Sequence, residues 1–279
     1  MWRISDSFCA GHPATDPKGI KTMLLKDKVA VIYGGAGSLG AGAAQAFTEA
    51  GARVFLAGRT ETTLAKAAAE VGAAGYDVLD AQDEEAVEAH ATSVVDRAGR
   101  IDISFNLVPR GDFQGRPLTE MSVADYTRPV FQGIACQFST ARAAARRMSA
   151  QSSGVILALD SGSRMGTPML GGTGAADGAL DALLRQLAQE LGPAGVRACG
   201  IWTAGVADSL TPGKLAAAGA PGMDEAALDG VRAHLDGLRM TRRSPRIADI
   251  AAVATFLASD AAQAITGTWI NATAGMFPS

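Results

Sequence analysis

A glycine-rich segment between a predicted strand and a predicted helix constrains the fold more than any other feature of this chain. Residues 29–33, Val-Ala-Val-Ile-Tyr, form a continuous apolar run typical of a strand buried on both faces of a parallel sheet. The segment Gly34-Gly35-Ala36-Gly37-Ser38-Leu39-Gly40 follows, and residues 41–50 then have the pattern of a helix closed by Gly51. The order strand, glycine loop, helix indicates the first unit of an α/β sheet.

The glycines have a specific chemical use in this context. They permit a tight turn, close approach of backbone to a pyrophosphate, and close packing of the helix on the strand. The helix N-terminus offers unpaired N–H groups to the phosphates. We therefore predict dinucleotide binding here, as an alternative to a turn that is merely tight; the predicted binding residues are Gly34, Gly35, Gly37, Ser38, Leu39 and Gly40.

The rest of the chain repeats the alternation of short apolar runs and longer helical stretches. Further strands are expected over residues 53–57, 75–78, 101–107, 155–159, 196–202 and 268–271. Helices are expected over 61–71, 83–98, 122–148, 175–191 and 247–259. This period predicts a single Rossmann-type, doubly wound parallel sheet of about seven strands with helices on both faces. Residues 210–238, rich in Ala, Gly and Pro, are expected to form a mobile loop with short helices.

Domain organisation and composition narrow the function. Residues 1–24 are predicted to be a flexible extension, and residues 25–279 one domain. The net charge of −3 does not indicate binding of nucleic acid. No apolar run has the length of a membrane span. The three cysteines lack metal-ligand spacing, which favours reduced thiols in the cytoplasm. We expect a small-molecule substrate of unknown identity and no metal.

The second strand bears on cofactor choice. A dinucleotide domain places an acidic residue beside the ribose for NAD, or an Arg for the extra phosphate of NADP. This chain has Gly58-Arg59-Thr60 there, without an acid. Arg59 favours NADP(H) over NAD(H), although an ordinary surface arginine is the competing interpretation.

Ligands of open α/β sheets bind beyond the carboxyl ends of the strands. Asp160 and Ser161 follow the predicted fifth strand, and Asp160 is an acid or base if burial raises its pKa, or else a cap for the next turn. Arg110, Asp112 and Arg164 are expected in loops at the cleft rim, where they would contact an anionic substrate.

From Lys28 onwards the chain resembles the short-chain dehydrogenase/reductase family. The resemblance is carried by the glycine segment, Gly99-Arg-Ile-Asp-Ile103, Glu190-Leu-Gly-Pro-Ala-Gly-Val-Arg197 and Leu257-Ala-Ser-Asp260. It implies that Asp77 and Val78 flank the adenine, that Asn106 is what remains of an Asn-Asn-Ala-Gly motif, and that Ser161 stands at the catalytic serine. It also implies a homo-oligomer, assembled through the helices around residues 135–145 and 179–187.

The family's Tyr-x-x-x-Lys pair has no match. Counting back from Glu190 places Thr173 at the tyrosine and Asp177 at the lysine, and Gly133 at the catalytic helix asparagine. A threonine hydroxyl has too high a pKa to replace a phenol, and an aspartate would raise a neighbour's pKa where lysine lowers it. An alternative interpretation makes Thr173 a helix N-cap with Asp177 as an acid in the first turn.

Three functions remain open from the sequence. The first is an NADP(H)-dependent oxidoreductase with a different proton donor, such as Asp160 with Ser161 or a bound water. The second is a nucleotide-binding or regulatory protein without hydride chemistry. The third is non-redox catalysis in the same cleft, since a fold does not fix a function.

Overall fold

The computed structural model describes residues 23–277, which form one parallel sheet covered by helices. The sheet has seven strands in the order β3-β2-β1-β4-β5-β6-β7, and each neighbouring pair is parallel. The strands are β1 (Val29–Tyr33), β2 (Arg53–Gly58), β3 (Gly75–Val78), β4 (Ile103–Asn106), β5 (Gly154–Asp160), β6 (Val196–Trp202) and β7 (Thr268–Asn271). The predicted Rossmann-type, doubly wound sheet is thus confirmed.

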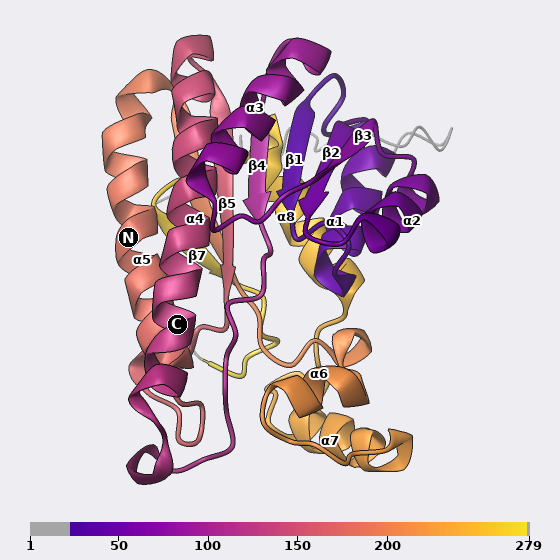
Figure 1. Ribbon diagram of the computed structural model, residues 1–279, viewed down its shortest axis with the longest axis vertical. Coiled ribbons are helices and arrows are strands. Elements are labelled where there is room, and N and C mark those ends of the chain that lie inside the picture. The colour runs from indigo at the N-terminus through magenta and orange to yellow at the C-terminus, as the bar shows by residue number, and fades with distance from the viewer. Residues whose placement is uncertain (1–22, 278–279) are drawn as a thin grey trace, which may run out of the picture.

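Helices cover both faces of this sheet (Figure 1). They are α1 (Ser38–Glu49), α2 (Glu61–Val71), α3 (Glu84–Ala98), α4 (Val123–Gln151), α5 (Thr173–Leu191), α6 (Pro212–Ala217), α7 (Glu225–Gly237) and α8 (Ile247–Ala258). One face carries α1, α2 and α8, and the other carries α3, α4 and α5. Residues 210–238 contain α6 and the longer α7, which lie together beyond the strand ends marked by the arrowheads.

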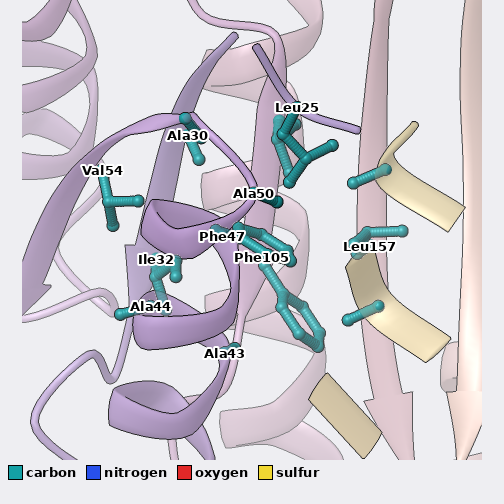
Figure 2. Packing of buried hydrophobic residues seen from close by; sticks show 14 of the residues in the cluster. Leu25, Ala30, Ile32, Ala43, Ala44, Phe47, Ala50, Val54, Phe105 and Leu157 are labelled. Carbon is teal, nitrogen blue, oxygen red and sulfur yellow. The ribbon is translucent and has the colours of Figure 1, made fainter. Parts of the chain in front are cut away.

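Strand β1 shows why a continuous apolar run was needed at this position. Ala30 and Ile32 pack into the core under α1 and α8, whereas Val29, Val31 and Tyr33 pack into the core on the opposite face. Side chains of a strand alternate between faces, so a strand covered on both sides is apolar throughout. Figure 2 shows the first of these cores, where Phe47 of α1 meets Phe105 of β4.

The order in which strands are added to the sheet reverses between β1 and β4: β2 and β3 lie on one side of β1, and β4 to β7 lie on the other. Strand β1 pairs with β2 on one side and with β4 on the other, so the connections after β1 and after β4 leave towards opposite edges. Ligands of doubly wound sheets bind in the crevice at such a switch point. The glycine segment and residues 107–109 form the two sides of this crevice.

The predicted ends of helices and strands are close to the observed ones where the sequence has a clear start or stop residue, such as a capping serine. Ser122 accepts a hydrogen bond from the N–H of Asp125 and caps α4, and Pro129 lies inside that helix without ending it. Helix α1 begins at Ser38, three residues earlier than predicted, so Ser38, Leu39 and Gly40 form its first turn. The predicted extension over residues 1–24 falls almost entirely outside the described residues. Within residues 23–277, no helix is both long enough and apolar enough to cross a membrane.

Candidate active site

The glycines of the first loop fall into two groups. A Cβ on Gly34 would lie 2.6 Å from the carbonyl oxygen of Leu107, and one on Gly40 would lie 2.2 Å from that of Gly34. A Cβ on Gly35 would meet the side chain of Leu56 at 2.9 Å. These three glycines allow the loop, the helix and β4 to approach closely. Gly37 is different, because its Cβ would meet only the Gly34 oxygen, at 3.2 Å.

A first cavity of about 270 Å³ lies on the β2 side of the glycine loop. Its lining includes Gly34 and Gly37 from the loop and Arg59 and Thr60 from the end of β2. The segment after β3 contributes Leu79, Asp80, Ala81 and Gln82. Asp77 and Val78 are absent from this lining, whereas Asp80 and Ala81 belong to it. Asp77 is the third residue of β3, whereas ligands meet the residues that follow a strand.

Asp77 has a different set of contacts. It pairs with Arg97 at 2.5 Å, and its carboxylate lies 3.4 Å from Nε2 of His90. Hydrogen bonding from His90 and Arg97 lowers the pKa of Asp77 despite partial burial. His90 is buried and reaches the hydroxyl of Tyr33 at 3.3 Å, so it is a core residue of α3 although its sequence neighbours are polar.

A second cavity of about 350 Å³ lies on the other side of the same loop. Gly37, Ser38, Leu39 and Gly40 line it from the loop and α1. Asn106 and the residues after it line it from β4, and its other walls carry Asp160, Ser161, Thr203 and Lys214. Asn106 is buried and accepts a hydrogen bond from the N–H of Val108, so its amide shapes the loop after β4. Gly37 and residues 107–109 line both cavities, which therefore adjoin at the switch point.

Asp160 is a titratable group of this cavity with a strongly shifted pKa. Its Oδ1 accepts a hydrogen bond from the N–H of Gly162 at 2.8 Å, so the turn-capping contact is present as well. Burial, with a further contribution from the charge of Asp177, raises the pKa of Asp160 to about 8. Asp160 therefore holds a proton at neutral pH while it faces the cavity.

Ser161 and Asp177 are in direct contact. The hydroxyl of Ser161 lies 2.5 Å from Oδ2 of Asp177 and 2.9 Å from the hydroxyl of Ser163. Asp177 also accepts bonds from the N–H and the hydroxyl of Ser163, both at 2.9 Å. Asp177 has no exposed surface and does not line the cavity itself. Its contact with the cavity runs through Ser161.

Arg110 supplies the cation of this cluster. Its Nη2 lies 2.7 Å from Oδ1 of Asp177, and its Nε donates to Asp112. Burial alone would lower the pKa of Arg110, but the two carboxylates outweigh burial and raise it. The aliphatic part of Arg110 packs over Gly133 of α4, where a Cβ would meet its Cδ at 3.2 Å. Arg110 and Asp112 both line the second cavity, as expected of residues at the cleft, and Arg110 is paired there with Asp112 and Asp177.

Thr173 is the first residue of α5, and the N-cap is Gly172, so the interpretation of Thr173 as a helix cap is wrong. Its hydroxyl donates to Asp112 at 2.8 Å and accepts from Gln114 at 3.1 Å. Asp177 lies in the second turn and not in the first. Arg164, the remaining residue expected at the rim, stacks on Trp202 at 4.1 Å from the ring centre and does not line this cavity.

Lys214 was not predicted from the sequence, because α6 has no recognisable motif. Its Nζ lies 3.0 Å from the hydroxyl of Ser38, in the first turn of α1. Burial lowers the pKa of Lys214, and among the described residues no carboxylate pairs with it. An ammonium group beside the N-terminus of α1 suits a phosphate ligand, because the free N–H groups of that turn also favour negative charge.

The two cavities fit a dinucleotide. Gly37 leaves space above the loop for a pyrophosphate, the cavity with Arg59 suits the adenosine half, and the cavity with Asp160 suits the nicotinamide half and a substrate. Among residues 23–277 no group of three or more His, Cys, Asp and Glu side chains is arranged to hold a metal ion.

Comparison with known proteins agrees with a dinucleotide-binding fold. The family model described as enoyl-(acyl carrier protein) reductase matches residues 34–277. Momilactone A synthase of Oryza sativa subsp. japonica is 31% identical over 261 residues, which cover 90% of each chain. Tropinone reductase-like 2 of Erythroxylum coca is 31% identical over 251 residues, covering 87% of this chain and 88% of the relative.

Solved structures agree with these relatives. The crystal structure of NAD⁺-bound xylitol dehydrogenase has a TM-score of 0.79 and 26% identity, covering 90% of this chain and 99% of that one. The family match, the relatives and the switch-point cavities lead to one conclusion: this chain is an oxidoreductase of the short-chain dehydrogenase/reductase family, with a fold that implies binding of a nicotinamide cofactor.

Proposed function

We propose that this protein is an NADP(H)-dependent oxidoreductase that interconverts a carbonyl and an alcohol, with Asp160 as the proton donor. The observation that carries the proposal is the position of Asp160: it lines the cavity next to the glycine loop and has a pKa raised to about 8. A general acid works best when its pKa lies near the operating pH. Thr173 and Asp177, at the positions of the family's tyrosine and lysine, do not line that cavity themselves and are bonded to Asp112 and Arg110, which do.

The reaction balances with these groups. A bound NADPH would supply a hydride to the carbonyl carbon, and the Asp160 carboxyl would give its proton to the carbonyl oxygen. The carbonyl becomes an alcohol, and Asp160 is left ionised until it regains a proton from solvent. In the reverse direction the Asp160 carboxylate accepts the proton of the alcohol.

The preference for NADP(H) rests on Arg59 and Thr60. Both line the cavity assigned to adenosine, and residues 58–60 offer no carboxylate to the ribose. An Arg at this place accommodates a 2′-phosphate. The NAD⁺ of the xylitol dehydrogenase structure belongs to that protein.

We also propose a homo-oligomer, assembled through α4 and α5. Phe131 and Phe138 of α4 are 72% and 44% exposed, which is unusual for large aromatic side chains. They are spaced by seven residues and therefore lie on one side of the helix. Light scattering that finds a monomer at micromolar concentration would contradict this assembly.

Calorimetric titration with NADPH and NADH tests the cofactor. A guanidinium bonded to a phosphate contributes enough for about a tenfold change in affinity. We expect Arg59→Ala to weaken NADPH binding by this factor and to leave NADH binding unchanged. Arg243→Ala, at an exposed arginine that does not line the cavity with Arg59, is the matched control. Tighter binding of NADH by the unaltered protein would contradict the NADP(H) preference.

A further inference from the structure

The sequence Thr211-Pro-Gly-Lys214 determines where α6 begins and where Lys214 lies in it. Thr211 is the N-cap, and its hydroxyl oxygen accepts a hydrogen bond from the N–H of Lys214 at 3.2 Å. Pro212 takes the first helical position, where no N–H is needed. Lys214 therefore lies in the first turn of α6, beyond the ends of the strands (Figure 1).

Helix α6 is bonded to both sides of the crevice at the switch point. On one side, Nζ of Lys214 donates to the hydroxyl oxygen of Ser38, in the first turn of α1, at 3.0 Å. On the other side, the N–H of Gln114, in the segment after β4, donates to the carbonyl oxygen of Ala218 at 2.9 Å, and Ala218 is the C-cap of α6. Lys214 and Ser38 both line the second cavity. The Lys214 ammonium is thus held beside the glycine segment.

The groups around this contact are hydrogen-bond donors. The ammonium of Lys214 carries three protons, of which Ser38 accepts one. Because the Ser38 oxygen accepts that bond, the proton of its hydroxyl remains for another acceptor. Helix α1 has no capping side chain at Gly37 and no acidic residue in its first turn, so its first N–H groups lack a side-chain partner. A ligand that satisfies these donors carries acceptors and negative charge.

Lys214 is also a cation without a carboxylate partner in the described part of the chain, where the lysines that form ion pairs are Lys28 and Lys66. Gly37 precedes Ser38, lines both cavities, and would hold a Cβ that meets only the Gly34 oxygen, at 3.2 Å. A ligand that runs from one cavity into the other therefore passes Gly37. The anionic part of a dinucleotide is its pyrophosphate, which joins the two halves assigned to these cavities.

We propose that Lys214 and the hydroxyl of Ser38 bind the pyrophosphate of the dinucleotide, together with the first N–H groups of α1. Lys214 thereby also links α6 to the cofactor, so each stabilises the position of the other. Residues 210–238 then contribute a cofactor-binding residue in addition to covering the substrate cavity. This inference rests on the dinucleotide site at the glycine segment, and on neither Asp160 nor Arg59.

Affinities for NADP⁺ and NAD⁺ test this contact, because both carry the pyrophosphate and only NADP⁺ carries the 2′-phosphate. Calorimetry compares the unaltered protein with Lys214→Gln, which removes the charge, and with Lys214→Arg, which keeps it. Lys26→Gln is the matched control, since Lys26 is exposed and lines neither cavity. Amide hydrogen exchange of α6 is measured with and without NADP⁺. Urea unfolding curves show that each variant is folded.

We expect Lys214→Gln to weaken the binding of both cofactors by about tenfold, because a charge-assisted bond to a phosphate is lost. The loss should shrink as the salt concentration rises, since salt screens a partly exposed charge. Lys214→Arg should keep most of the affinity, and Lys26→Gln should bind like the unaltered protein. NADP⁺ should slow exchange in α6 of the unaltered protein and slow it less in Lys214→Gln.

Equal affinities of Lys214→Gln and the unaltered protein would overturn the contact, as would an equal loss in Lys26→Gln or no binding of either cofactor by the unaltered protein. Weakened binding of NADP⁺ alone would move Lys214 to the 2′-phosphate and contradict the pyrophosphate assignment. Equal protection of α6 in Lys214→Gln would overturn its link to the cofactor. Binding that depends on Lys214, without reduction of any carbonyl by NADPH, would support the contact and contradict the proposed oxidoreductase chemistry.

Discussion

Nη2 of Arg110 lies 2.7 Å from Oδ1 of Asp177, where the loop after β4 meets the second turn of α5. Arg110 has a side chain that is 12% exposed, and Asp177 is fully buried. Such a pair adds little over well-packed apolar residues, but loss of one partner leaves the other charge buried without compensation. The pair therefore fixes the wall of the cavity that contains Asp160 and Ser161.

Removal of the Arg110 guanidinium should destabilise the fold. Arg110→Met leaves Asp112 and Asp177 facing each other without a cation, and we expect the free energy of unfolding to fall by about 3–5 kcal/mol. Urea denaturation measures this change. Lys66→Met, which breaks an exposed pair with Glu70 on α2, should cost about 0.5 kcal/mol or less and serves as the control. Equal losses in the two variants would contradict the structural role of Arg110.

Asp160 should make stability depend on pH in an unusual direction. Its pKa is about 8 in the folded protein, against about 3.9 for an unperturbed aspartate. Between these values the folded state holds the proton that the unfolded state has lost. The stability that Asp160 contributes is therefore complete below pH about 4 and is lost as the pH rises through about 8.

Comparison with Asp160→Asn isolates this effect, because an amide does not titrate. The stability of the variant relative to the unaltered protein should rise steadily from acidic to slightly alkaline pH. Urea denaturation at a series of pH values measures it. Parallel pH profiles would mean that Asp160 keeps an ordinary pKa.

Gly37 and Gly40 should respond differently to an added methyl group. A Cβ on Gly40 would lie 2.2 Å from the Gly34 oxygen, so Gly40→Ala should unfold at a markedly lower temperature. A Cβ on Gly37 would lie 3.2 Å from the Gly34 oxygen, which a small shift of the loop relieves, and Gly37 lines both cavities. Gly37→Ala should keep the unfolding temperature while weakening NADPH binding about tenfold or more. Unchanged NADPH affinity in a folded Gly37→Ala protein would move the pyrophosphate away from this loop.

The sheet was predictable because its signals are local. A few consecutive residues are enough to predict each of three elements: the apolar strand β1, the glycine turn and the helix capped by Ser122. Asp77 shows what counting along a motif leaves open: Asp77 lies within β3 and pairs with Arg97, whereas Asp80, three residues later, lines the first cavity.

The cluster around Asp177 was not predictable, because its members come from segments far apart in the chain. The sequence placed Arg110 at the rim and Asp177 on a helix, but gave no sign that they meet. The fold brings them together: Arg110 packs its aliphatic part over Gly133, and its guanidinium lies 2.7 Å from Asp177. The raised pKa of Asp160 likewise depends on burial and on the nearby charge of Asp177.

The most direct test of the account is the reduction of a panel of carbonyl compounds by NADPH with the unaltered protein and with Asp160→Asn. We expect kcat/KM for reduction to fall above pH 8, the value near which Asp160 loses its proton. We expect Asp160→Asn to lose about 10²- to 10⁴-fold in kcat, as for removal of a general acid, with NADPH affinity unchanged. Turnover by Asp160→Asn at the unaltered rate would contradict Asp160 as the proton donor, and NADPH binding without any turnover would instead indicate a nucleotide-binding protein without hydride chemistry.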